Sequence, residues 1–420
     1  MTGFGNIWKT IDIGGVWRRI ASGGAGYHAL LLFFGLMAVV GAAAGIHALF
    51  IVGSRHGYAT YREIPLALLI STYTFFIGAS TGIYIISSFG HVFGFRELMP
   101  IAKRTIYLSI ITVLAGYMSI GLEIENPIRM FIYVVLSPNL RSNIWWMSAL
   151  YAFFLFFMVI GFFLLLVKKY RVAAIAGFLA VVSVIAADSN MGGIFAMMHG
   201  RQFWYGPFLP VYFIASAMMT GCAFIMFFTL LAYRIKKEPL ETGTARSIEF
   251  IRTLSILMVA IIMFFTFWKI LTGIVGDPQE IENMRILIAG SYAFNFWVFE
   301  ILCGMVVPFI LLLASKGERY ILMLIASAMM IIGIFFIRLD LVIIGQIVPM
   351  YFDLGVKEFD HLHTYWPSLH EILVVLGCVG FCCFAYLLGE KIFDGFKESD
   401  QCLSPEAIDN NHAEELQVQQ

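Results

Sequence analysis

The sequence predicts an all-α polytopic membrane protein with about ten transmembrane helices. Of its 420 residues, 60% are hydrophobic and only 13% are charged, and the mean hydropathy is +0.86. Soluble domains are about 45–50% apolar and about 25% charged, so a soluble fold could not bury this excess. The apolar runs are long, whereas the strands of a membrane barrel alternate over about 10 residues. The 27 Lys and Arg residues only balance the 27 Asp and Glu residues, which leaves no basic excess for nucleic acid.

Ten segments are long enough to cross a bilayer, which takes about 20 apolar residues in a helix. The first apolar run is longer than the core of a signal peptide and begins about 25 residues into the chain, so we expect a retained helix. In chain order the predicted spans are 28–52, 64–89, 105–122, 143–167, 172–189, 207–233, 250–275, 286–315, 320–345 and 369–389.

The distribution of Lys and Arg predicts the orientation. The loops near 96–104, 168–171 and 234–246, together with both ends of the chain, carry more than twice as many Lys and Arg residues as the opposite loops. The positive-inside rule then places both termini in the cytoplasm. The segment after 394 is polar and acidic, which is typical of a solvated tail.

Ionisable side chains recur at the outer ends of the first spans. Charge at membrane depth is expensive and usually lines a cavity or a path. Glu123 and Asp188 each end an unbroken apolar run, and we expect them to exchange protons. The other side chains expected at this depth are Tyr61, Glu63, Tyr73, His199 and Arg201. The alternative is that these residues are interface anchors and salt bridges.

A polar stripe follows one face of the second span. Helical spacing aligns Tyr73, Ser80, Tyr84, Ser87 and His91, with Ile77 as the apolar interruption. The stripe predicts a proton path through Tyr84 and His91 to Glu97 on the inner side. Packing between helices, aided by small residues, explains the same pattern equally well.

The second half carries its own ionisable set, for which an ion-pair network is the favoured interpretation. Lys269 is expected to pair with Glu300 across two spans. The remaining members are Arg338, Asp340, Glu371 and Glu390.

Cofactor motifs are weak. The six cysteines form no CxxC pair and the histidines show no repeat spacing, so we expect no iron–sulfur cluster and no haem in this chain. The His361 and His363 pair beside Asp360 is too little for a metal site. An outer polar pocket without these groups suits a lipid-soluble quinone, whose carbonyls need hydrogen-bond donors and whose protons need a carboxylate or His. The aromatic and Met residues would line a groove for its tail.

Four motifs in order resemble the NrfD/PsrC family of membrane proteins. The segment from Glu123 (Glu-Ile-Glu-Asn-Pro-Ile-Arg-Met) followed by Leu136-Ser-Pro-Asn-Leu resembles the family's Asp-Leu-Gly-Arg-Pro and Pro-Asn-Leu-Thr-Ser segment. The run from Phe76 (Phe-Ile-Gly-Ala-Ser-Thr-Gly) resembles its Gly-rich second helix. Segments beginning at Arg338 and Tyr365 resemble the ten-helix branch, which includes HybB, the membrane subunits of alternative complex III and especially QrcD. Here Glu123 replaces the family's Asp, and Asn126 its Arg.

The resemblance implies two four-helix bundles flanked by one helix at each end. The expected division is 1–53 (N-terminus and first helix), 54–205 (first bundle with the quinone site), 206–346 (second bundle), 347–393 (outer loop and last helix) and 394–420 (cytoplasmic tail). It further implies menaquinone as the bound substrate and a periplasmic four-cluster iron–sulfur subunit as the partner. Molybdopterin-type and multihaem cytochrome c subunits are further partners that it allows.

The resulting hypothesis is a quinone-binding subunit of a respiratory complex in the bacterial inner membrane. It would exchange electrons between a periplasmic iron–sulfur partner and menaquinone near Glu123 and Asp188, with proton uptake from the cytoplasm. Two alternatives stay open: a secondary transporter or ion translocator without redox chemistry, and a membrane anchor whose site is inactive.

Overall fold

The computed structural model describes residues 13–350, 352, 361–393 and 396, and every regular element within them is a helix. Ten of these helices are long and apolar enough to cross a membrane, which confirms the predicted fold class. The acidic tail after 394, residues 1–12 and most of the loop at 351–360, including Asp360, lie outside the described residues.

The ten membrane-length helices begin and end within a few residues of the predicted spans in most cases. The first bundle contains α5 (Leu68–His91), α6 (Ala102–Glu123, preceded by the 3-10 helix η2, Arg96–Ile101), α8 (Asn143–Leu166) and α9 (Tyr170–Ala196). The second bundle contains α10 (Phe208–Lys236), α11 (Thr242–Val275), the π-helix η3 (Asn295–Val306) with α13 (Val307–Ser315), and α14 (Tyr320–Ile347). The flanking helices are α3 (Ala25–Ile46), continued by the π-helix η1 (His47–Gly53), and α15 (Leu369–Ile392). These two bundle names keep the division that the resemblance predicts.

Short helices account for the differences from the predicted spans. The apolar α7 (Pro127–Leu136) has no buried residue, and α12 (Pro278–Ile288) precedes η3 rather than extending it, so the predicted span 286–315 began too early. Two further short helices are α2 (Ile13–Ala21) and α4 (Ser54–Gly57). The prediction that Asp188 ends a span was wrong, because α9 continues to Ala196 and Asp188 lies about two turns before its end.

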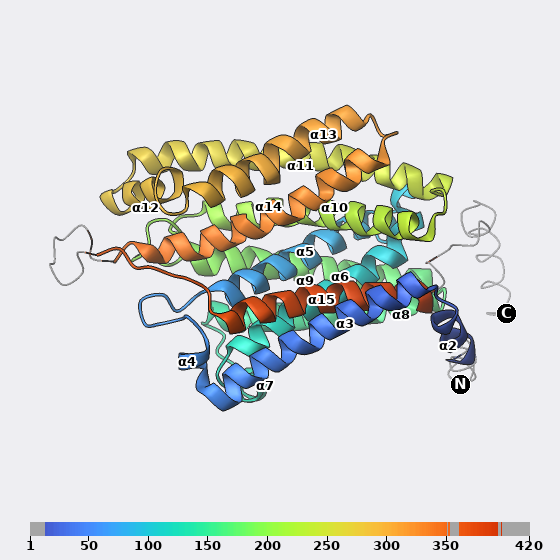
Figure 1. Ribbon diagram of the computed structural model, residues 1–420, viewed down its shortest axis with the longest axis horizontal. Helices are drawn as coiled ribbons and strands as arrows, with labels where there is room; N and C mark the ends of the chain where they lie inside the picture. Colours follow the sequence, from blue (N-terminus) through green and yellow to red (C-terminus); the bar gives the residue numbers. More distant parts are fainter. Residues whose placement is uncertain (1–12, 351, 353–360, 394–395, 397–420) are drawn as a thin grey trace, which may run out of the picture.

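The helices run roughly parallel to one long axis, and α5 lies in the middle of the molecule (Figure 1). It packs against α6, α9, α10 and α14, and its membrane-crossing stretch is 94% buried. The flanking helices α3 and α15 lie side by side, and α15 also packs on α6. We call the end where α3 begins and α15 ends the terminal end, since the Tyr27 hydroxyl donates to the Leu387 carbonyl there (3.2 Å). The opposite end, with α4, α7 and α12, is the distal end.

The two bundles approach each other most closely where α5 crosses α10. Gly82 and Gly221 face each other at this crossing, and a Cβ atom on either would collide with the backbone of the other helix. Small residues permit such close helix contact in membranes, where dispersion forces and hydrogen bonds replace the hydrophobic drive.

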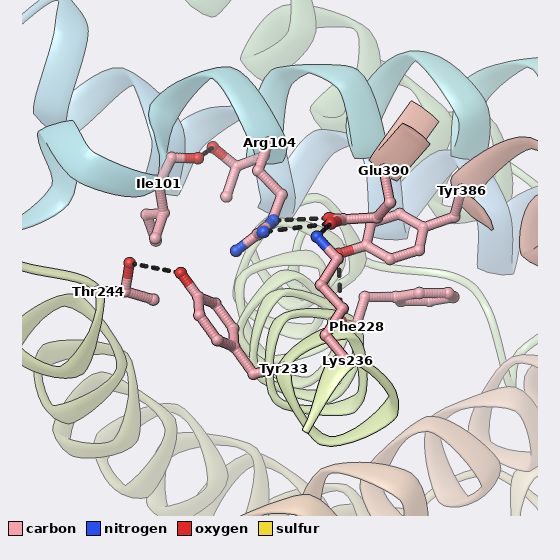
Figure 2. A network of polar contacts seen from close by, with 9 residues as sticks. Ile101, Arg104, Phe228, Tyr233, Lys236, Thr244, Tyr386 and Glu390 are labelled. Carbon is pink, nitrogen blue, oxygen red and sulfur yellow. Dashed lines mark hydrogen bonds and ion pairs between the residues drawn. The ribbon is translucent and has the colours of Figure 1, made fainter. Parts of the chain in front are cut away.

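A fully paired polar network joins three helices near the terminal end (Figure 2). Arg104 of α6 donates to Glu390 of α15 through both Nε (2.8 Å) and Nη2 (3.3 Å), and Lys236 of α10 donates to the same carboxylate (2.6 Å). Beside it the Tyr386 hydroxyl donates to the Phe228 carbonyl (3.1 Å). The predicted ion-pair role of Glu390 is therefore confirmed.

Candidate functional site

Asp188 of α9 lies in the interior of the first bundle among phenols. Its side chain is 0% exposed, and the only hydrogen bond to it from the described residues is a long one from the Tyr151 hydroxyl to Oδ1 (3.4 Å). Oδ2 is buried and has no partner among the described residues. Tyr73 of α5 and Tyr117 of α6 complete the group around Tyr151. A buried carboxylate with a free oxygen is an acceptor available to a ligand or water.

Arg338 of α14 carries the charge opposite to Asp188. Its side chain is 1% exposed, its Nη2 donates to the Ser216 hydroxyl (2.7 Å), and its guanidinium carbon lies 4.1 Å from the centroid of the Phe213 ring. The charges of Arg338 and Asp188 attract each other, yet no ion pair joins them and Nη1 has no partner among the described residues. Gly78 of α5 makes room for this guanidinium, because a Cβ atom there would lie 3.3 Å from Nη2.

Arg338 offers a hydrogen-bond donor, and Asp188 an acceptor, to a ligand bound between them. An unpaired buried guanidinium nitrogen and an unpaired buried carboxylate oxygen each cost free energy, so each is expected to have a role beyond packing. A ring with an oxygen that alternates between carbonyl and hydroxyl could accept from Arg338 and donate to Asp188. The surrounding side chains are tightly packed, with Tyr73 6% and Tyr151 1% exposed. Entry of a ring would require a side chain to move.

A second acidic group lies nearer the distal end, where α6 ends and α15 begins. Glu371 is 1% exposed and accepts hydrogen bonds from the Tyr365 hydroxyl (3.0 Å) and the Ser368 amide (2.6 Å). Glu123 lies close enough that both carboxylates act on Tyr58, whose hydroxyl donates to the Leu122 carbonyl (2.6 Å). The Oε2 atom of Glu123 is buried without a partner among the described residues.

The two phenols of this group resist ionisation. Burial, followed by the charges of Glu123 and Glu371, raises the pKa of Tyr58 to about 12. Burial and the adjacent Glu371 also raise the pKa of Tyr365. Both phenols therefore stay protonated at neutral pH and act as hydrogen-bond donors.

Arg201, Glu63 and Tyr61 serve as ties between loops at the distal end. Arg201 donates to the carbonyls of Gln346 (3.1 Å), Val348 (3.0 Å) and Glu63 (3.3 Å), and burial lowers its pKa. The Tyr61 hydroxyl donates to the Thr364 carbonyl (2.8 Å). All three residues hold the loop before α5, and these contacts leave them outside the group around Asp188.

His199 lies at the edge of a shallow hollow at the distal end of α9 and α10. Its ring centroid is 4.6 Å from that of Tyr205, and Tyr205 lines the hollow. The hollow measures about 330 Å³, and its walls are otherwise small and apolar: Gly193, Ala196, Met197, Gly206, Pro207 and Pro210.

The hydroxyls in the polar stripe of α5 pack against the neighbouring helix, and the predicted proton path along the stripe is not tested. Ser80 donates to the Ser109 carbonyl (2.9 Å), and Ser87 accepts from Thr105 (2.8 Å), so these hydroxyls join α5 to α6 as the packing alternative predicted. The rings of Tyr84 and His91 meet edge to face with centroids 5.8 Å apart. Glu97 is exposed at the terminal end. The proton path along these three residues stays a prediction.

The predicted site thus separates into parts. Tyr73 and Asp188 share one interior group, and Glu123 belongs to a second group nearer the distal end. Arg338, Tyr151, Glu371 and Tyr365 were missed as site residues. Their places in the sequence are remote, and only the motifs beginning at Arg338 and Tyr365 pointed to these segments.

The comparison with family models gives one match that covers most of the chain. Residues 58–350 match the family described as "Polysulphide reductase, NrfD". The match spans α5 to the end of α14 and includes every residue of both groups except those of the 361–393 segment.

Three curated relatives are similar over most of their length. The C subunit of the selenate reductase of Mesobacillus selenatarsenatis is 21% identical, covering 80% of this chain and 87% of the relative. The "Hdr-like menaquinol oxidoreductase integral membrane subunit" of Archaeoglobus fulgidus is 24% identical, covering 79% and 85%. The protein named as the membrane C subunit of a dimethyl sulfoxide reductase in Halobacterium salinarum is 23% identical, covering 88% and 90%. With its ten apolar helices and this family match, the chain is a multi-pass integral membrane protein that belongs to the NrfD family.

Proposed function

We propose that this chain is the quinone-exchanging membrane subunit of a respiratory redox complex. The names of the relatives support this function, since each is a membrane or C subunit of a reductase or oxidoreductase and one is named for menaquinol. Menaquinone is the proposed substrate, and a peripheral iron–sulfur protein docked at the distal end is the proposed electron partner. The chain itself would contribute binding and proton transfer.

The observation that carries the proposal is the unpartnered pair of Asp188 Oδ2 and Arg338 Nη1 in the interior of the protein. A quinone oxygen needs a donor while it is a carbonyl and an acceptor once it is a hydroxyl, and these two atoms supply both. Arg338 would hold the oxygen, and Asp188 would take or return its proton. The phenol of Tyr151, which already donates to Asp188, would orient the carboxylate.

Glu123 and Glu371 would connect the interior group to the distal surface. Glu123 lies on the same helix as Tyr117, and its free Oε2 atom can accept a proton. Tyr365 would keep Glu371 in position as a neutral donor, while Tyr58, whose hydroxyl donates to the Leu122 carbonyl, lies beside both carboxylates.

Proton uptake from the terminal end, through His91 and Tyr84, would make quinone reduction electrogenic. With electrons arriving at the distal end and protons from the cytoplasm, charge crosses the membrane in each turnover. A full crossing is worth about 2.3 kcal/mol per charge at 100 mV, which is enough to influence the direction of the reaction.

The experiment is substitution in the intact complex. Asp188→Asn and Glu123→Gln should each lower quinone turnover at least about 100-fold, the scale of lost general acid–base catalysis, without changing the amount of assembled complex. The matched control is Glu125→Gln, because Glu125 is exposed two residues from Glu123. Normal turnover in both Asp188→Asn and Glu123→Gln would remove the site assignment.

A transporter without redox chemistry is the second candidate, favoured by the ionisable side chains of Lys269, Glu300 and Asp340 in the second bundle. Mild purification separates the two functions. A quinone-exchanging protein should bring an iron–sulfur protein and quinone with it, whereas a transporter should bring neither.

A further inference from the structure

Three ionisable side chains meet inside the second bundle, away from the proposed quinone site. Glu300 lies in η3, Asp340 in α14 and Lys269 in α11, and their charges act on one another. Glu300 is 7% exposed and Asp340 is 1% exposed. Three helices that are separate in the sequence therefore place charged groups at one point within the membrane-crossing region.

The two carboxylates adjoin each other inside the second bundle. Asp340 lies beside the side chains of Glu300 and Asn295, yet both of its oxygens are buried and neither forms a hydrogen bond of good geometry with the described residues. Two ionised carboxylates are both acceptors, so they can bond only when one of them carries a proton. Carboxyl pairs of this kind elsewhere share a single proton because both cannot ionise at contact distance.

Lys269 does not form the ion pair with Glu300 that the sequence suggested. Its Nζ lies 4.0 Å from the centroid of the Phe203 ring, and no ion pair joins it to Glu300 or Asp340. The expected Lys269–Glu300 salt bridge was wrong, because the aromatic ring receives the ammonium group instead. The lysine is left as a nearby counter-charge.

Glu300, Asp340 and Lys269 together leave one negative charge in excess, and the partly exposed Glu280 of α12 adds to it. Asp188 and Arg338 balance each other across the bundle boundary, while Glu300 and Asp340 face the single positive charge of Lys269. An uncompensated charge in a membrane interior is costly, and one bound proton removes it. The groups facing the pair are Tyr212 of α10, Glu280 of α12 by way of Lys269, Tyr292 before η3 and Asn295 of η3.

Glu300 lies in a π-helix and not in a regular α-helix. η3 is a π-helix of 12 residues, a rare geometry that is frequent at functional sites, and Glu300 lies at its middle. η3 also packs along α14, the helix that carries Asp340.

The helix α14 links this cluster to the first bundle. Residues 338 and 340 are two positions apart and point to nearly opposite sides of a helix with 3.6 residues per turn. Arg338 thus faces Asp188, while Asp340 faces Glu300. Tyr212 lies between, within electrostatic range of both Glu300 and Arg338.

We propose that Glu300 and Asp340 share one exchangeable proton, with Lys269 as its counter-charge, and that α14 couples this proton site to Asp188. The ligand is a proton, taken up by the carboxylate pair and released to water without any bond to carbon or change of oxidation state. The coupling to quinone chemistry rests on the proposed function, whereas the proton site itself does not.

The test is infrared spectroscopy of the purified full-length chain in lipid nanodiscs, without turnover. The spectrum of the wild-type chain should contain a protonated-carboxyl band that is missing from both Glu300→Gln and Asp340→Asn, since the remaining carboxylate would ionise beside Lys269. Glu249→Gln, which removes an exposed carboxylate on α11, is the matched control and should keep the band. A band that persists in both variants would overturn the proposal.

Two further measurements keep the proposal testable if either variant fails to fold. In the wild-type chain, carbon-13 labels placed separately in Asp and in Glu carboxyls should both shift the band, because the proton is shared. A band that responds to Na⁺ in place of choline, and not to pH, would identify a cation site and contradict the proposal. An unchanged pH dependence of the band in Asp188→Asn would remove the coupling, and lost turnover with an intact band would concern the proposed function alone.

Discussion

Buried charges are paired with one another in the terminal-end network, whereas in the Asp188 group they are left partly unpaired. At the terminal end, Glu390 receives three hydrogen bonds from Arg104 and Lys236, and all three charged groups are satisfied at 2.6 to 3.3 Å (Figure 2). Between the two bundles, Asp188 of α9 and Arg338 of α14 are deeply buried but form no ion pair, and each keeps an atom without a partner among the described residues. Both regions bury a carboxylate and an arginine, and the terminal-end network adds Lys236, whose side chain is 26% exposed. The main difference is the pairing.

The difference indicates which charges hold the fold and which serve chemistry. The charged groups of the terminal-end network already bond to one another, so they are not available to a ligand. The role of this network is therefore to join α6, α10 and α15. Without a ligand, the unpaired atoms of Asp188 and Arg338 are buried without hydrogen bonds, which destabilises the protein. A ligand that bonds to both atoms can restore this free energy. Exchanging or removing single members of either region therefore tests the comparison.

The largest effect on stability is expected at Glu390. Glu390→Gln leaves the positive charges of Arg104 and Lys236 without a counter-charge, and breaking a buried pair costs about 3–5 kcal/mol. Thermal unfolding of the detergent-solubilised chain should show the loss, while quinone turnover per folded molecule stays at the wild-type level. An unchanged unfolding midpoint would mean that the terminal-end network does not stabilise the fold.

Arg338→Lys is expected to act mainly on function. One ammonium group cannot both donate to Ser216 and present a free nitrogen toward Asp188, as the guanidinium does. Quinone turnover should fall about 10- to 100-fold, a loss of about 1.4–2.7 kcal/mol in transition-state stabilisation. Arg252→Lys, at an Arg paired with Glu249 on α11, is the control, and equal turnover in both variants would argue against a role of Arg338 in the reaction.

Tyr58 gives a prediction about pH. Its folded-state pKa of about 12 exceeds the ordinary value of 10.0, so the folded chain keeps a proton that the unfolded chain loses, and stability falls as pH rises from 10 toward 12. The fall should be less steep in Tyr58→Phe, whereas Tyr133→Phe, at an exposed phenol on α7, should match the wild type. Parallel curves of unfolding midpoint against pH for all three proteins would show that Tyr58 is not held neutral.

The smallest effect is expected for the half-exposed Arg252–Glu249 ion pair on α11. Arg252 and Glu249 approach to 2.6 Å, but the side chain of Glu249 is 44% exposed, and such pairs contribute about 0–1 kcal/mol. Glu249→Gln should therefore leave both the unfolding midpoint and turnover nearly unchanged. A loss comparable to that of Glu390→Gln would show that pairing, and not burial, determines the stabilisation.

Hydropathy sufficed to predict the ten helices because each membrane-crossing run is long and unbroken. It missed α7 and α12, which are too short for the length criterion, and it ended α9 at Asp188 because a carboxylate in an apolar run resembles a boundary. Asp188 was identified as a candidate because charge at that depth is unusual.

The partners of the site residues could not be read from local patterns. Arg338 faces Asp188 across 150 positions of sequence, and Glu371 lies near Glu123 only because α15 packs on α6. The second-half set was predicted to be one ion-pair network. The structure pairs Glu390 but leaves Asp340 without a hydrogen bond of good geometry to the described residues, a distinction that depends on side-chain geometry.

The most direct test is the binding of a water-soluble menaquinone analogue to the purified full-length chain, compared between Asp188→Asn and Glu390→Gln at a temperature where both are folded. We predict at least about tenfold weaker binding in Asp188→Asn, equal to about 1.4 kcal/mol, and wild-type binding in Glu390→Gln. Wild-type affinity in Asp188→Asn would contradict the proposal that Asp188 and Arg338 bind the quinone.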